Sequence, residues 1–295
     1  MPFNVDQITE TEFAVALRGG DAPCYLVPVA PEVRTMLQEM LTETIGEMES
    51  IGGLEDIDYG EEYGNRVSLQ CPIDDPTVAH VVELFNAQNM PLAAAALDDP
   101  SCIDFYFARF TDQAGGRCLA VKTPSQFKAT IGKKLIRILD DTLVVVEDKI
   151  FKLDNRFDFI VFDDRVAILN PKQFMRVAEV EQILADMAPQ HVNEIAQAMD
   201  IVDFEPILEY VQRRKRAQKL VSSIRKRPTL GQITLPMLQE VCNRNNIPMT
   251  EQNGKLVPEN GHEMDFLELL DGRRYPYPLE EEDPELLRAL RRKKV

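Results

Sequence analysis

The chain has 295 residues, 44% of them hydrophobic, and a formal net charge of −16 at pH 7. This length allows one large domain or two ordinary ones, and the hydrophobic content is typical of globular proteins and not of disordered ones. The start of the sequence has no secretory-signal pattern, and no apolar run approaches the roughly 18 residues of a membrane span. We therefore expect a soluble protein of a reducing compartment, in which the five widely spaced cysteines stay free thiols.

The charge is unevenly distributed along the chain. Residues 1–100 hold 19 acidic and 3 basic side chains, whereas residues 101–295 hold 30 of each, so the whole net charge belongs to the first third. We place a soft domain boundary near residue 100, between an acidic α/β section at 1–100 and an α+β section at 101–295. The two sections can also share one core. Such asymmetry indicates separate partners for the acidic and basic parts.

Hydrophobic periodicity predicts the elements of the first section. A helix is predicted over 9–17, and Pro31 begins a clear amphipathic helix whose outer face carries Glu32, Glu39, Glu43 and Glu47. Short strands are predicted over 24–29 and 66–73, and a further helix over 77–89. The acidic, glycine-containing residues 46–64 are typical of a solvated loop, because they lack the ligand spacing of an EF-hand.

Strand patterns dominate after residue 101. A hairpin is predicted from strands 103–110 and 117–122 around the loop 112–116, followed by a helix over 125–139 with a basic outer face. Four short strands follow at 142–146, 150–153, 157–162 and 166–169. Because short connections cannot join parallel strands, these strands predict an antiparallel meander.

The last third is predicted to be mainly helical. Asn170 and Pro171 form a typical helix start, and Pro189 is expected to end that helix. A long helix is predicted over 203–227, and further helices over 234–245 and 263–270. The fold class we expect is α+β, with an antiparallel β-meander packed against several helices and a helical C-terminal part.

The basic segment, residues 213–227, is the sharpest local signal. It holds eight cationic side chains and no acidic one. Three interpretations remain open: a phosphate-binding surface for DNA, a surface for an acidic protein, or a helix whose charges meet solvent or this chain's own acids. The nucleic-acid-binding candidates of this segment are Arg213, Arg214, Lys215, Arg216, Lys219, Arg225, Lys226 and Arg227. A second group of candidates is Lys128, Lys133, Lys134 and Arg137.

No catalytic motif is legible in the sequence. Nucleophile-elbow, phosphate-loop and dinucleotide-binding patterns are all missing, and the three histidines are too far apart to suggest a zinc site. Residues 147–149 (Glu-Asp-Lys) resemble the end of a metal-dependent nuclease core, with Asp140 or Asp141 nearby, but a hairpin turn is the better interpretation. We expect no enzyme activity, no cofactor and no metal, with a nuclease as an alternative.

Three stretches resemble the KwaB-like family (the DUF4868 domain). They are residues 157–170 together with Phe174, residues 266–275, and the early residues 25–28. The resemblance is strongest over about residues 101–275 and consists of hydrophobic-pattern motifs. Phe157, Asp158, Asn170 and Phe174 are interpreted as architectural positions, and the family pattern supplies no catalytic residue.

The resemblance implies a role in the Kiwa anti-phage defence system. It implies a cytoplasmic, dimeric protein that binds DNA and docks onto the membrane protein KwaA at the inner face of the cell membrane, without inserting into it. From charge alone we add the hypothesis that Glu39, Glu43 and Glu47 meet a basic face of that partner. An adaptor without DNA binding is the alternative.

Overall fold

The structure is a computed structural model that describes residues 3–18, 24–64, 67–92, 102–124, 136–139, 142–145, 152–276 and 286–288. It divides into two compact units. Unit 1 comprises Met1–Asp56 and Asn65–Ala178, and unit 2 comprises Ile57–Gly64 and Glu179–Val295. The predicted boundary near residue 100 falls inside unit 1, because strands from both sides of it pair in one sheet.

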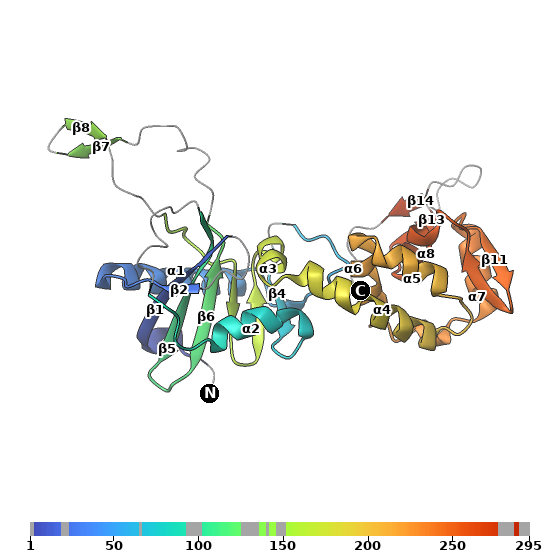
Figure 1. Cartoon of the computed structure of the whole chain (residues 1–295), viewed down its shortest axis with the longest axis horizontal. Helices are drawn as coiled ribbons and strands as arrows, with labels where there is room; N and C mark the ends of the chain where they lie inside the picture. The colour runs from blue at the N-terminus through green and yellow to red at the C-terminus, as the bar shows by residue number, and fades with distance from the viewer. Residues whose placement is uncertain are drawn as a thin grey trace. The chain divides into compact units, whose positions relative to one another are not determined.

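Unit 1 is built on a sheet of eight strands in the order β2-β1-β5-β6-β9-β10-β4-β3 (Figure 1). All neighbours are antiparallel except β3 and β4. The strands are β1 Ile8–Leu17, β2 Cys24–Leu26, β3 Glu55–Asp56, β4 Leu69–Pro72, β5 Ile103–Asp112, β6 Arg117–Lys122, β9 Phe159–Val161 and β10 Arg165–Ile168. A separate hairpin pairs β7 (Ile136–Leu139) with β8 (Thr142–Val145).

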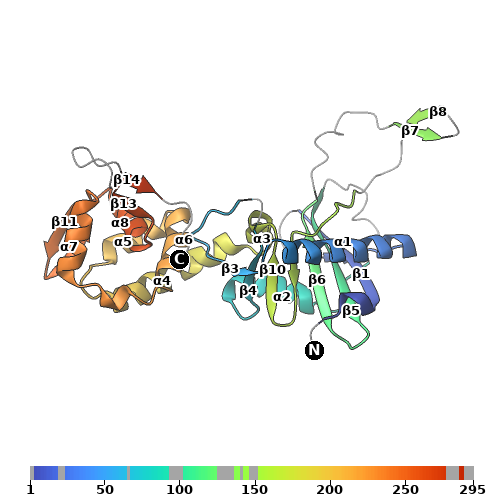
Figure 2. The same ribbon diagram turned by 180° about the vertical axis from the view of Figure 1, so that it is seen from behind.

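Helices cover both faces of this sheet. Helix α1 (Pro31–Ser50) crosses in front of the sheet in Figure 2, and buries Leu37 and Leu41 in the cluster that contains Phe13 and Tyr106. On the other face lie α2 (Ala79–Asn86) and α3 (Pro171–Val177), where the Phe174 ring meets the edge of the Phe159 ring at 5.3 Å between centroids. Two short 3-10 helices, Val5–Gln7 and Pro76–Val78, complete the described helices of this unit.

Several predictions for unit 1 are confirmed. The β5–β6 hairpin turns at residues 112–116, where the Asp112 carboxylate accepts hydrogen bonds from the backbone N–H groups of Asn4, Ala114 and Gly116. The helix that begins at Pro31 is α1, and the Asn170 side chain caps α3. The five cysteines all lie in the described ranges, as free thiols. The α+β fold class is therefore confirmed.

Two predicted helices of unit 1 are wrong where the structure describes them. Residues 9–17 belong to strand β1, because Phe13 and Val15 alternate onto the same buried face and pair with β5. Residues 136–139 form β7 instead of the end of a helix, and residues 125–135 lie outside the described residues. The predicted strand at 150–153 is also wrong over residues 152–153, which have no regular structure.

Unit 2 is mainly helical. Its core includes Leu184, Val192, Ile207, Val221 and Phe266, each at most 2% exposed. The helices are α4 Val180–Ala198, α5 Glu205–Gln212, α6 Lys215–Ile224, α7 Leu235–Arg244 and α8 Glu263–Leu270, with a 3-10 turn at Leu230–Gln232. Two small hairpins pair β11 (Met249–Gln252) with β12 (Lys255–Pro258), and β13 (Arg274–Pro276) with β14 (Leu286–Arg288).

Helix boundaries in this part of the chain differ from the prediction. The helix that begins at Pro171 ends at Val177, and α4 begins at Val180. Helix α4 continues through Pro189, since buried Ala188 and Val192 on either side keep the helix packed despite the lost backbone donor. The long helix predicted over 203–227 is two helices, separated at Arg213 and Arg214. Arg214 is extended, with φ −134° and ψ 106°.

Candidate nucleic-acid interface

The basic segment bends where its charges are densest. Residues 213–216 are four consecutive cations, and the break between α5 and α6 lies within them. Like charges one helical turn apart destabilise a continuous helix. Arg213, at the C-cap of α5, lies at the negative end of that helix dipole, whereas Lys215 and Arg216 begin α6, where cations are unfavourable. The first turn of α6 therefore needs negative partners.

Carboxylates from two other helices supply those partners. Glu181 of α4 lies 2.8 Å from the Lys215 ammonium and 3.1 Å from the Lys219 ammonium. Glu268 of α8 lies 2.8 Å from the Arg216 guanidinium. Hydrogen bonds from Lys215 and Lys219 hold the pKa of Glu181 below its usual value. Much of the basic charge of α6 is thus compensated inside unit 2.

The end of the basic segment is also partly compensated. Arg225 contacts the Glu194 carboxylate at 3.0 Å. Burial opposes ionisation of Glu194, but hydrogen bonds from Gln190 and Arg225 outweigh it, so the pKa of Glu194 is lowered. Arg227 donates to the backbone carbonyl of Leu270. These two arginines fasten α6 to neighbouring elements of unit 2.

Three exposed cations of the segment hold no close ion pair in the described residues. The Arg213 side chain is 79% exposed and lies a loose 3.9 Å from Glu209. Arg214 is exposed, with its guanidinium 5.6 Å from the Tyr210 ring centroid. Lys226 is exposed as well, and within the described ranges neither Arg214 nor Lys226 forms an ion pair. These side chains are available to an external polyanion.

The second group of candidates is hardly described. Lys128, Lys133 and Lys134 lie outside the described residues, and Arg137 lies in strand β7 instead of on a helix. The nuclease residues Glu147 and Lys149, with Asp140 and Asp141, also lie outside them. Among the residues that the structure describes, no group of three potential metal ligands comes together.

The residues interpreted as architectural make structural contacts. Phe157 is 2% exposed and its ring meets Phe110 edge-on. The buried Asp158 carboxylate accepts hydrogen bonds from Lys122, Asn170 and the Thr123 backbone N–H. These bonds connect β6 to the start of α3. The positions therefore serve the core of unit 1, as expected from their residue types.

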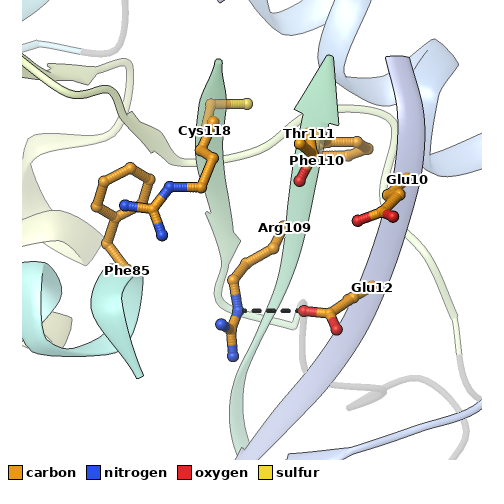
Figure 3. Close-up of a pocket in the computed structure, with 8 residues that line it drawn as sticks. Glu10, Glu12, Phe85, Arg109, Phe110, Thr111 and Cys118 are labelled. Carbon is orange, nitrogen blue, oxygen red and sulfur yellow. Dashed lines mark ion pairs between the residues drawn. The ribbon is translucent and has the colours of Figure 1, made fainter. Parts of the chain in front are cut away.

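A small polar pocket lies on the sheet of unit 1 (Figure 3). The Arg109 guanidinium lies 3.7 Å from Glu12, and Arg117 stacks 4.7 Å from the centroid of the Phe85 ring. Arg109 also donates to the backbone carbonyl of Ala87, and burial lowers its pKa. Glu10 and Glu12 together carry as much negative charge as Arg109 and Arg117 carry positive charge, so the side chains that line the pocket have no net charge. The pairs connect β1, β5, β6 and α2, a structural role.

Sequence reasoning missed the three glutamates that form ion pairs with four cations of the basic segment. Glu181 and Glu194 lie in α4, and Glu268 lies in α8. Each is between 31 and 52 residues from its arginine or lysine partner. No local spacing could have identified them, because the pairs form only when the helices of unit 2 pack.

A comparison with protein-family models matches the Kiwa protein KwaB-like family over residues 101–278, more than half of the chain. The chain belongs to this family. Kiwa KwaB-like membership makes the protein a component of the Kiwa anti-phage defence system. The matched range begins two residues before β5 and includes the whole basic segment. No curated protein and no solved structure matches the chain. Among the described residues, no helix is long and apolar enough to cross a membrane.

Proposed function

We propose that this protein is a non-catalytic DNA-binding subunit of a membrane-associated Kiwa complex. The observation that carries the proposal is that Arg213, Arg214 and Lys226 are exposed in a segment without acidic residues. Exposed cations bind duplex DNA through its phosphates without reading base sequence. Family membership supports a defence role for this binding.

The exposed glutamates of α1 support a second contact in the same complex. Glu32, Glu39, Glu43 and Glu49 are exposed and form no ion pair within the described part of the chain. A basic cytoplasmic face of the membrane subunit KwaA would complement them. In this arrangement the two charged surfaces serve different partners, and a homodimer would present each surface twice.

A triple substitution tests the DNA contact. Arg213→Gln, Arg214→Gln and Lys226→Gln together remove three cations that hold no close ion pair in unit 2. Each lost phosphate contact reduces the salt exponent by about 0.9, so we expect affinity for linear duplex DNA to fall by about two to three orders of magnitude at roughly 0.1 M salt. Fluorescence anisotropy of labelled duplex DNA measures the affinity of the triple variant and of the unmodified protein.

The matched control removes three cations elsewhere on the surface. Arg165→Gln, Lys172→Gln and Lys255→Gln change net charge by the same amount outside the basic segment. They should leave affinity within about threefold, because a localised surface depends on which cations are removed and not on net charge alone. Equal losses in both variants would contradict a localised DNA surface. No DNA binding by the unmodified protein would favour the adaptor alternative.

The adaptor alternative has one observation of its own. The carboxylates of Glu181, Glu194 and Glu268 already partner four of the eight cations. The partly compensated surface of the basic segment can bind an acidic protein as well as DNA.

For the nuclease alternative, Glu147→Ala is the test: it should abolish Mg²⁺-dependent cleavage if that activity exists.

A further inference from the structure

One carboxylate holds two lysines of the basic segment. Oε2 of Glu181 lies 2.8 Å from Nζ of Lys215, and Oε1 lies 3.1 Å from Nζ of Lys219. The two lysines are four residues apart in α6, so their side chains lie on the same helix face. Together they bind a single oxyanion with one ammonium on each oxygen.

This lysine pair is accessible to an external anion. The side chains of Lys215 and Glu181 are 76% and 45% exposed, and Lys219 is 25% exposed. Glu268, the partner of Arg216, differs because only 1% of its side chain is exposed. An incoming phosphate can therefore displace Glu181, whereas it cannot reach Glu268 without opening unit 2.

A DNA phosphate resembles the Glu181 carboxylate in the features that the lysines recognise. Each carries one negative charge over two oxygens, and both accept charge-assisted hydrogen bonds from ammonium groups. The exposed Arg213 and Arg214 come immediately before Lys215, so a DNA backbone bound there runs close to the lysine pair.

We propose that Lys215 and Lys219 form a binding site for a DNA phosphate, and that Glu181 occupies this site when DNA is absent. The inference rests on the proposed DNA binding and adds an internal competitor to it. DNA must displace Glu181 to gain the two lysine contacts, so the carboxylate weakens DNA binding by this surface. Removing Glu181 opens the site.

Two substitutions in α4 test the site. Glu181→Gln and Asp186→Asn both remove one negative charge from exposed positions of the same helix. Asp186 accepts a hydrogen bond from Gln182 and forms no ion pair within the described ranges. We expect Glu181→Gln to bind linear duplex DNA about eightfold more tightly at roughly 0.1 M salt, with the salt exponent steeper by about 0.9. Asp186→Asn should stay within about twofold of the unmodified protein.

The outcomes separate this inference from the proposed function. Equal affinities of the two variants would overturn the site, because only net charge would matter. Binding by Glu181→Gln but not by the unmodified protein would support the site and refute constitutive DNA binding. If neither bound DNA, both proposals would fail. A gain on phosphatidylglycerol vesicles alone would also overturn the DNA assignment. Adding Lys215→Gln and Lys219→Gln should abolish the gain of Glu181→Gln.

Discussion

Helices α1 and α6 differ in what their charged faces contact. Glu32, Glu39, Glu43 and Glu49 of α1 extend to solvent without an ion pair in the described part of the chain. The cations of α6 instead contact carboxylates of α4 and α8 at 2.8–3.1 Å. The acidic run is therefore a charged surface, whereas most of the basic run serves the packing of unit 2.

The difference follows from where each helix lies. Helix α1 covers one face of a sheet with its apolar side (Figure 2). Of the glutamates on its outer side, Glu47 pairs with Arg156, and the other four named above are exposed. Helix α6 is packed among other helices and buries seven of its ten residues. Long cationic side chains at its margins then reach acids on the neighbouring helices, which removes the repulsion between them.

The largest stability effect is expected at Arg216. Arg216→Gln leaves the buried Glu268 without its 2.8 Å ion pair, and we expect unit 2 to lose about 1–3 kcal/mol of unfolding free energy. Arg213→Gln removes only a loose, exposed ion pair with Glu209 and should change the unfolding free energy by less than about 0.5 kcal/mol. Urea unfolding compares the two. Equal losses of unfolding free energy would show that the Arg216–Glu268 ion pair contributes no more to stability than the Arg213–Glu209 pair.

A smaller effect is expected from pH. The pKa of Glu181 is lowered in the folded protein, so its ion pairs stabilise the fold above the usual value of 4.5 and lose that effect as pH falls through the lower folded value. At neutral pH, the free energy of unfolding of the unmodified protein should exceed that of the Lys215→Gln, Lys219→Gln double variant by at most about 1 kcal/mol. In acid the difference should vanish. A pH-independent difference would contradict an ionic role for Glu181.

The smallest stability effect is expected on α1. Replacing Glu39, Glu43 and Glu49 by Gln removes the repulsion between Glu39 and Glu43, which are one turn apart, and should raise stability by about 0.2–0.5 kcal/mol. Glu47 is kept because it pairs with Arg156.

The same variant should no longer co-purify with KwaA. Unchanged co-purification would remove the acidic face from the proposed complex.

The sequence predicts local features of this fold better than its charge pairs. The β5–β6 hairpin and the Asn170 cap follow from residues within a few positions of each other. Strand β1 was missed, because its pairing with β5 joins residues about 95 positions apart. The partners of the basic segment were missed for the same reason, since Glu181 and Glu268 reach α6 only after the helices pack.

The salt dependence of DNA binding tests the central claim most directly. The measurement is the affinity of the unmodified protein for linear duplex DNA between roughly 50 and 300 mM salt. Three open cations and one net charge from the lysine pair predict an exponent of about −3.6, at about 0.9 per contact. An exponent of about −7 would mean that all eight cations bind phosphates and that the internal ion pairs do not limit binding. No binding at the lowest salt would contradict the DNA-binding account itself.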